Sequence, residues 1–389
     1  MKILFISPHL HSFEYAKGGA EQRTYLMLKA LSQFAEVDFA AFHAVAGFDV
    51  LPLNIVYEKS VTDVVNRSKL KKWLPVLQFW NRKKIFPINK DKAEIIKNLV
   101  NKTKYDYIFT RYITKAMECN LLNYSERTIV DVDDLPSDYY MIMSKNSKSS
   151  SGKIRYFLMS KIATFHQRQI IKKVKVAFSP NFDSAQMYDC AYLPNIPFYE
   201  QTCAKIEFAK TKKRIFFVGG LWYEPNYLGV DYFLKNIYQK LVEKMPDVEF
   251  YIAGAMNKNN DFKTEWEKFP NVKVLGFVED LQKEYENSRV VVVPIYQGAG
   301  TNIKVVEAMQ MNRACVPSEF ATRGFSVFFT DKKDYCIAHC DKEYIQILEH
   351  LLTDEKFNQT IAKNGRQILQ EHFSFETFAE KLKKVFSKL

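Results

Sequence analysis

The stretch from Pro294 to Met309, which reads PIYQGAGTNIKVVEAM, brings together residues that could bind a phosphate and a sugar. It follows a run of valines, residues 290–293, that is typical of a buried parallel strand. Glycines let a phosphate approach the backbone, and the free N–H groups at a helix start attract anions. Lys304 would add a positive charge, and Glu307 could accept hydrogen bonds from ribose hydroxyls. The spacing indicates a nucleotide-sugar site, with a phosphate-binding loop that contains Gly298, Gly300, Thr301 and Asn302.

The same residues also have a simpler interpretation. A glycine loop before a helix is common, so Lys304 could be a solvated lysine and Glu307 its salt-bridge partner. In either case we expect a helix over residues 302–310, capped by Thr301 or Asn302.

Two other glycine pairs follow expected strands. Gly219 and Gly220 come after a strand over residues 214–218 and mark a tight turn. Gly18 and Gly19 precede a helix expected from residue 21 to residue 34, which makes either a second anion-binding turn or an ordinary connection.

A cluster of acids ends the strand expected over residues 128–134. Asp131, Asp133 and Asp134 would lie at the carboxyl end, where open α/β sheets place their ligands. They could be general bases or a cap for the next segment. No second acidic cluster accompanies them, so we predict no metal site.

The elements that must position these residues alternate regularly in the second half of the chain. This alternation predicts a doubly wound parallel sheet. Strands are expected over residues 214–218, 248–253, 272–275, 290–294 and 314–317, and helices over 229–244, 281–287 and 302–310.

The segment GAGTNIKVVEAM resembles the donor-binding signature of the GT-B glycosyltransferases, in particular the large retaining group called family four. In that signature two glutamates with seven residues between them are followed by Ala-Met. Glu307, Ala308 and Met309 match the second glutamate and its neighbours, whereas the first glutamate falls on Ala299. The resemblance implies that Lys304 serves the diphosphate and Glu307 the ribose. It covers nearly the whole chain and is strongest from Phe217 to Val316.

The resemblance also implies roles for residues outside this signature. Gly18 and Gly19 resemble the N-domain glycine pair that faces the donor phosphates, and Asp133 stands where the family usually has a histidine, as a candidate contact to the donor sugar or acceptor. Gly276, Phe277 and Val278 resemble the loop whose backbone contacts the base.

One region departs from the family. Many relatives carry an arginine and a lysine for the diphosphate after the first strand of the second domain. This chain has Gly220, Leu221, Trp222 and Asn226 there, which leaves more of that charge to Lys304.

With 389 residues the chain is long enough for two domains. The resemblance implies a GT-B architecture, in which two Rossmann-like domains face a cleft and a C-terminal helix crosses back to the first. We place an acceptor-side domain at residues 1–200 plus the helix 374–389, a donor domain at 205–373, and a linker near 205–213.

Positive charge is concentrated in the first half of the chain. The net charge is +12, yet residues 67–104 hold twelve basic residues against two acids, and residues 141–182 hold nine against none. This asymmetry indicates an anionic partner. Apolar residues interleaved with the lysines of residues 61–104 suggest an interfacial helix, or a helix docked on its own sheet with a solvated basic face.

Other features of the chain concern its location. Six scattered cysteines form no CxxC pair, so reduced cytosolic thiols are expected. The N-terminal apolar run is too short for a signal peptide, and no run is long enough to cross a membrane. We expect a cytoplasmic protein that is peripheral at the inner face of the membrane.

The leading hypothesis is a retaining, metal-independent glycosyltransferase. It would need no cofactor and would move a sugar from a UDP- or GDP-linked donor to a lipid-linked or surface-polysaccharide glycan. An epimerase or hydrolase of the same fold, which also uses nucleotide sugars, is one alternative. The other is a non-catalytic basic protein that binds a polyanion or lipid. Nucleic acid is not an expected partner, because the sequence contains no nucleic-acid motif.

Overall fold

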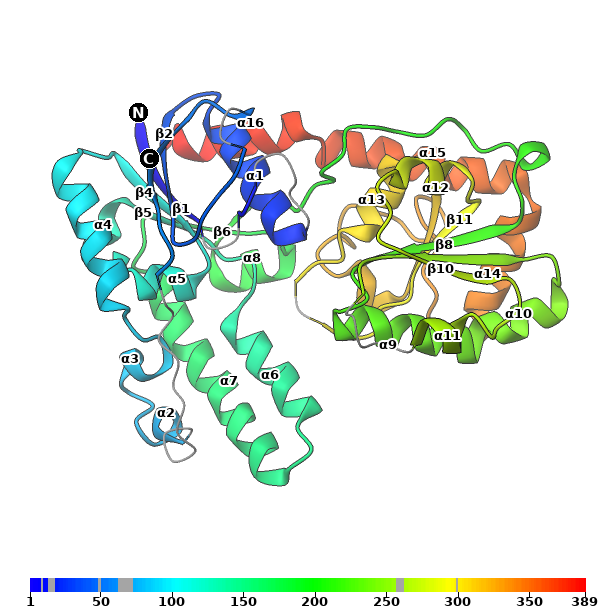
Figure 1. Cartoon of the computed structure of the whole chain (residues 1–389), viewed down its shortest axis with the longest axis horizontal. Coiled ribbons are helices and arrows are strands. Elements are labelled where there is room, and N and C mark those ends of the chain that lie inside the picture. The colour runs from blue at the N-terminus through cyan, green and yellow to red at the C-terminus, as the bar shows by residue number, and fades with distance from the viewer. Residues whose placement is uncertain (8–9, 13–17, 48–49, 62–72, 257–261, 299) are drawn as a thin grey trace. The chain divides into compact units, whose positions relative to one another are not determined.

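The computed structural model describes residues 1–7, 10–12, 18–47, 50–61, 73–256, 262–298 and 300–389. The chain forms two compact units (Figure 1). The first contains Met1–Pro194 together with Phe378–Leu389, and the second contains Asn195–Thr377. Each unit has its own parallel sheet covered by helices, which confirms the predicted class of two doubly wound α/β domains.

The sheet of the first unit has seven strands in the order β3-β2-β1-β4-β5-β6-β7, and every pairing is parallel. The strand order changes direction between β1 and β4, so side chains after these strands share one end of the sheet. The bounds are β1 Lys2–Ser7, β2 Glu36–Ala41, β3 Leu53–Glu58, β4 Tyr107–Arg111, β5 Thr128–Asp131, β6 Val176–Ser179 and β7 Ala191–Tyr192.

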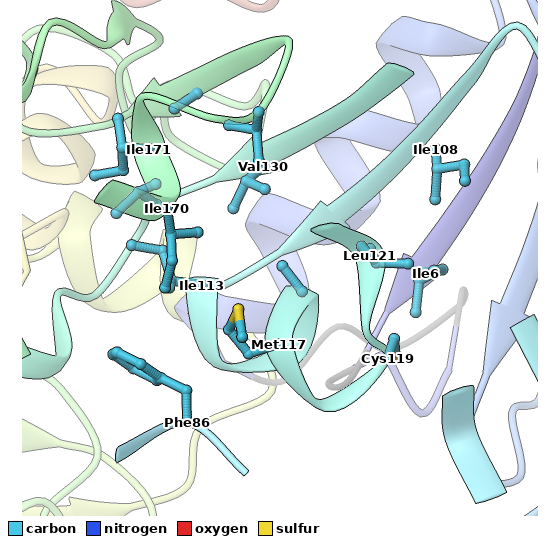
Figure 2. Packing of buried hydrophobic residues seen from close by; sticks show 14 of the residues in the cluster. Ile6, Phe86, Ile108, Ile113, Met117, Cys119, Leu121, Val130, Ile170 and Ile171 are labelled. Atoms are coloured by element: carbon cyan, nitrogen blue, oxygen red, sulfur yellow. The ribbon is translucent and has the colours of Figure 1, made fainter. Parts of the chain in front are cut away.

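Helices α5 and α7 close one part of the first unit's core. Ile113 and Met117 of α5 and Ile170 of α7 pack with strand residues that include Ile6 and Val130 (Figure 2). The helices of this unit are α1 Gly19–Leu31, α2 Leu74–Leu77, α3 Arg82–Ile85, α4 Lys90–Lys102, α5 Ile113–Glu118, η3 Leu121–Arg127, α6 Pro136–Asn146, α7 Ser150–Ile171 and α8 Phe182–Tyr188. Thus α1 begins two residues before the expected start and ends three residues before the expected end.

The last helix, α16, spans Phe375–Phe386, and its end belongs to the first unit. The ring of Phe386 lies 5.6 Å from Phe34 and Tyr107 and 6.4 Å from Phe109, measured between centroids. These aromatic contacts fix the returning chain to β4 and to the turn after α1.

The sheet of the second unit has five parallel strands in the order β10-β9-β8-β11-β12. Its order changes direction between β8 and β11. The strands are β8 Arg214–Val218, β9 Glu249–Ala253, β10 Val272–Gly276, β11 Val290–Val293 and β12 Ala314–Pro317. The helices are η4 Phe208–Lys210, α9 Glu224–Phe233, η5 Leu234–Tyr238, α10 Gln239–Lys244, α11 Phe262–Trp266, α12 Leu281–Glu286, α13 Lys304–Gln310, η6 Glu319–Thr322, α14 Asp341–Thr353 and α15 Glu355–His372.

The segment after Pro194 packs on the second unit, although we expected the first domain to reach residue 200 and a linker near 205–213. The guanidinium of Arg313 donates to the carbonyl of Ala204 at 2.9 Å, and Ile206 is buried. These contacts make residues 195–213 a part of the second unit rather than a free connection.

Candidate active site

The predicted glycine turns of the second unit follow adjacent strands. Gly219 and Gly220 come after β8, and Gly298 and Gly300 come after β11. Because the strand order reverses between β8 and β11, both turns lie at the switch point, where open α/β sheets bind their ligands.

Lys304 lies across the turn after β8. A methyl group at Gly219 would lie 2.5 Å from the Cε of Lys304 and 3.0 Å from the Nδ2 of Asn226. Asn226 is buried and donates to the Gly220 carbonyl at 2.8 Å. Four predicted residues, Gly219, Gly220, Asn226 and Lys304, therefore form one cluster. The absence of a side chain at Gly219 is what lets the lysine occupy this position.

The loop before α13 is longer than expected, because the helix begins at Lys304 rather than at Asn302. The expectation that Thr301 or Asn302 caps the helix is wrong: Ile303 holds the cap position, and no side chain caps the helix. Gly298 and Gly300 have positive φ values of 138° and 67°, so the chain turns there and enters the helix later. Thr301 instead accepts a hydrogen bond from Asn195 at 2.7 Å.

Arg323 supports this loop and was not foreseen from the sequence. Its Nη2 donates to the carbonyl of Gly298 at 3.1 Å and to that of Gly300 at 3.5 Å. Ala299, which replaces the family's first glutamate, lies outside the described residues.

Glu307 follows Lys304 on α13 but does not form the salt bridge considered as the simpler interpretation. Within the described part of the chain no ion pair joins the two side chains. Burial raises the pKa of Glu307, and the charge of Lys304 opposes this shift. Burial likewise lowers the pKa of Lys304, with Glu307 opposing. Burial thus disfavours the charged form of both groups, and each is opposed by the charge of the other.

A small cavity of about 20 Å³ lies beside Glu307, with walls that include Tyr199, Leu281 and Tyr285. The hydroxyl of Tyr285 is buried and has no hydrogen-bond partner among the described residues. The carboxylate of Glu307 raises the pKa of this tyrosine, after the larger effect of burial. Glu307 therefore lines a small cavity whose wall also contains an unused donor.

Phe277 and Val278 lie farther along the same end of the sheet, directly after β10. Phe277 is 68% exposed. The backbone connects this turn with the others, because Gly254 donates its N–H to the Gly276 carbonyl at 2.7 Å. Among the described residues, no hydrogen bond joins Phe277 or Val278 to the loop after β11.

In the first unit, Gly18 and Gly19 begin α1. A methyl group at either position would meet no atom of the described residues within 4 Å. Packing against this part of the chain therefore does not demand these glycines.

The acids at the end of β5 and directly after it meet two arginines that the sequence did not reveal as partners. Asp131 is fully buried, and its two oxygens accept from Arg23 at 2.7 Å and 3.0 Å. Arg111 adds a third bond at 3.0 Å. Burial alone would raise the pKa of Asp131, but the two arginines outweigh it and lower the pKa. Asp131 is therefore a permanent anion that holds Arg23 and Arg111, not a general base.

Asp133 and Asp134 differ from Asp131 and from each other. Asp133 pairs with Nη2 of the same Arg111, and its side chain is 12% exposed. Asp134 reaches solvent yet is closely surrounded by protein, and this burial, together with the charge of Asp133, raises its pKa to about 7. Neither acid caps the next helix, because α6 begins with Leu135 at its cap position and without a side-chain bond.

The described residues also bear on metal binding and on membrane insertion. They contain no group of three or more His, Cys, Asp or Glu side chains arranged to hold a metal ion. Among them, too, no helix is long and apolar enough to cross a membrane.

Comparisons with known proteins found a matching family and several relatives. Residues 212–354 match the family described as Glycosyl transferases group 1. An uncharacterized 44.6 kDa protein in the cps region of Klebsiella pneumoniae is 20% identical over 320 residues, which cover 79% of each chain. The capsular polysaccharide biosynthesis glycosyltransferase CapM of Staphylococcus aureus is 24% identical over 157 residues, or 38% of this chain and 40% of CapM.

Solved structures match the chain over its full length. The Anabaena protein HepE in complex with UDP has a TM-score of 0.65 at 14% identity and full coverage of both chains. Sucrose-phosphate synthase from Thermosynechococcus elongatus has a TM-score of 0.67 at 14% identity, covering 100% of this chain and 98% of that one. At these identities the likeness establishes the fold, which is GT-B.

Proposed function

Because residues 212–354 match the group 1 glycosyltransferases, we propose that the chain transfers a sugar from a nucleotide-sugar donor to a glycan acceptor. The observation that carries this proposal is the position of Lys304 across the Gly219–Gly220 turn, with Glu307 on the same helix. A cation next to exposed backbone and a carboxylate one turn away suit a diphosphate followed by a ribose.

Donor binding would use the residues of the second unit in distinct roles. Lys304 contacts the diphosphate, the loop that contains Gly298, Gly300, Thr301 and Asn302 supplies backbone N–H groups, and Glu307 accepts hydrogen bonds from the ribose. Gly219 and Gly220 leave room for the phosphates, while Asn226 fixes their turn through the Gly220 carbonyl. Phe277 and Val278 would reach the base.

Catalysis in this proposal rests on orientation and on stabilisation of the leaving diphosphate. Lys304 meets the charge that develops on the diphosphate when the bond to the sugar breaks, and the open start of α1 at Gly18 and Gly19 offers further N–H groups. We propose retention of the anomeric configuration and no metal requirement. An inverted product in a proton NMR assay would contradict retention, and loss of turnover in EDTA would contradict metal independence.

Asp133 is the proposed contact to the donor sugar or acceptor hydroxyls. Arg111 pairs with this carboxylate and holds it in place.

The acceptor we propose is a lipid-linked or surface-polysaccharide glycan, handled at the inner face of the membrane. The relatives from a cps region and from capsular polysaccharide biosynthesis support this class. A thermal-shift screen with UDP, GDP and dTDP tests the donor, because a ligand that binds only the folded state raises the melting temperature. The Anabaena neighbour bound to UDP makes UDP the first choice. No shift with any of the three nucleotides would contradict the proposed donor.

The first unit carries a surface that supports membrane docking. In α7, Ile154, Phe157 and Phe165 are exposed by 57%, 44% and 54% and recur at helical spacing. Lys161 extends over the ring of Phe157 at 5.3 Å. Figure 1 shows α6 and α7 packed as a hairpin that extends beyond the sheet.

The end of α2 and the turn that follows it also expose apolar side chains. Leu77, Phe79 and Trp80 are exposed by 66%, 55% and 67%. The carbonyl of Phe79 lies 2.6 Å from Nε2 of His166 in α7, which holds these residues against the hairpin. Lys71 and Lys72, in the basic segment expected to form an interfacial helix, lie outside the described residues. Apolar rings framed by lysines suit an anionic leaflet.

A further inference from the structure

A groove on the second unit, separate from the Lys304 cluster, has a volume of about 950 Å³. Its walls come from α9 and η5, from the two residues before the glycine loop, and from residues 338–344 at and before the start of α14. The aromatic and hydrogen-bonding residues that matter for the following argument are Tyr232, Asn236, Tyr296, Gln297 and Asp341.

Two tyrosines form the centre of this groove. Tyr232 and Tyr296 are 41% and 40% exposed, and their ring centroids lie 5.0 Å apart at an angle of 66°. Asp341 accepts from the Tyr232 hydroxyl at 3.0 Å and 3.1 Å, which fixes this ring. Exposed aromatic surface is unfavourable in water, and these two fixed rings offer flat apolar faces to a ligand.

Hydrogen-bonding groups surround the rings. The side-chain amide of Gln297 has no partner among the described residues, and Asn236 uses only its Nδ2, which donates to the Tyr232 carbonyl at 2.9 Å. The carboxylate of Asp341 has acceptor capacity beyond the tyrosine bond. These groups can pair with hydroxyls that donate and accept.

The charge of the groove argues against a phosphate-bearing ligand. Lys235 is paired with Asp231 at 2.8 Å, and Asp341 places a negative charge beside the rings. With Lys342 the wall carries two cations and two anions, so no net positive field is available for a nucleotide or lipid headgroup. Flat apolar faces edged with neutral polar groups fit a ligand that has C–H faces and many hydroxyls, which is a sugar chain.

The groove adjoins the donor loop. Gln297 precedes Gly298 directly, and Pro225 in the groove wall would lie 3.6 Å from a methyl group at Gly298. We infer that the groove between α9 and α14 binds an oligosaccharide, with sugar rings on Tyr232 and Tyr296 and hydroxyls on Gln297, Asn236 and Asp341. This inference goes beyond the transfer reaction and requires no bound donor.

Isothermal titration of the full chain with maltoheptaose, cellohexaose and chitohexaose, with and without saturating UDP, tests the inference. We expect at least one oligosaccharide to bind equally in both conditions. The variants Tyr232→Ala and Tyr296→Ala should each weaken its binding roughly three- to tenfold, the loss of one aromatic contact. Tyr139→Ala, which removes a 57% exposed tyrosine of the first unit, is the matched control and should change nothing.

Several outcomes would overturn the inference: no binding of any of the three sugars, equal binding by the tyrosine variants, or complete competition by UDP. A thermal shift with UDP, measured on the same variants, separates this site from the donor site. If the parent binds an oligosaccharide but no nucleotide, the groove stands and the proposed transfer reaction fails. If UDP stabilises all variants and no sugar binds, the transfer reaction stands and the groove fails.

Discussion

The Cε of Lys304 lies so close to Gly219 that a methyl group at residue 219 would be 2.5 Å away from it. The contact joins the turn after β8 to Lys304, the first residue of α13. The position of this lysine therefore depends on residue 219 being a glycine, which has no side chain.

Gly219→Ala should displace Lys304 and weaken UDP binding without unfolding the protein, because the end of a lysine side chain can move. Gly254→Ala is the contrasting variant. Its methyl group would lie 1.9 Å from the Gly219 carbonyl oxygen, a backbone atom that cannot move alone, so we expect a loss of stability of about 1–3 kcal/mol or more. Titration with UDP and thermal unfolding distinguish the two effects. Wild-type UDP affinity in Gly219→Ala would contradict the role of Lys304.

Glu307→Ala should weaken UDP binding by roughly 1.5–3 kcal/mol, or about 10- to 150-fold, because two ribose hydroxyls lose their acceptor. Glu307→Gln keeps the shape and one acceptor oxygen and should lose less. A deoxyribose analogue of UDP provides the matched ligand control, since it should bind parent and Glu307→Ala with more similar affinities. If Glu307→Ala binds UDP as tightly as the parent, the ribose assignment is wrong.

UDP affinity should fall on both sides of neutrality. Burial raises the pKa of Glu307, so its carboxylate is lost on acidification at a higher pH than the usual value of about 4.3. Burial lowers the pKa of Lys304, so its charge is lost on the alkaline side below the usual value of about 10.4. Calorimetry at a series of pH values measures both limbs. Glu307→Gln should remove the acid limb, and uridine, which has no phosphate, should lack the alkaline limb.

Asp134→Asn should stabilise the protein at alkaline pH and have little effect under acid conditions. The pKa of Asp134 is raised to about 7 in the folded protein, against about 3.9 when unfolded. Between these two pKa values Asp134 is protonated in the folded state and ionised in the unfolded state. The free energy of unfolding of the parent therefore falls as the pH rises from about 3.9 to about 7, and it stays lowered at higher pH. Melting temperatures of parent and variant at about pH 4 and about pH 8 test this. An equal difference at both pH values would contradict it.

Arg111→Ala should destabilise the first unit by about 3–5 kcal/mol, because Asp131 and Asp133 would lose a shared buried partner. Asp133→Asn should cost much less stability, since Asp131 still satisfies the guanidinium, but it should lower sugar transfer. Chemical unfolding followed by a tryptophan placed in the first unit measures the stability. A stable Arg111→Ala variant would show that Arg23 alone satisfies Asp131.

The parallel strands could be predicted because runs such as Val290–Val293 are apolar throughout, as strands buried on both faces require. The candidate donor loop after β11 could also be proposed, since Gly298, Gly300, Lys304 and Glu307 lie within ten residues of sequence. The helix start could not be predicted, because Thr301 and Asn302 are good caps whose preference is overridden by the turn at Gly300.

The arginine network could not be predicted for a different reason. Arg23 and Asp131 are 108 positions apart and meet only because β1, β4 and β5 are neighbours in the sheet. Arginines at a helix start and at a strand end are ordinary in sequence. The only available signal was a cluster of three acids that needed buried partners. The groove of Tyr232, Tyr296 and Asp341 likewise joins three separate segments.

Binding to anionic vesicles should depend on α7. Near an anionic leaflet each well-placed Lys or Arg contributes about 1 kcal/mol, and the attraction fades within a Debye length, so binding should weaken in high salt. The variant Phe157→Ser with Lys153→Glu and Lys161→Glu removes an exposed ring and reverses two charges on the hairpin. The variant Lys71→Glu with Lys72→Glu probes the basic segment before α2.

Val327→Ser with Lys240→Glu and Lys244→Glu makes the same kinds of change on the second unit and serves as the matched control. Co-sedimentation with phosphatidylglycerol vesicles and with neutral phosphatidylcholine vesicles, at low and high salt, should show binding to the anionic vesicles alone, lost in the α7 variant and kept in the control. Equal loss in both variants would indicate a general charge effect, and no binding of the parent at low salt would leave a soluble acceptor as the better account.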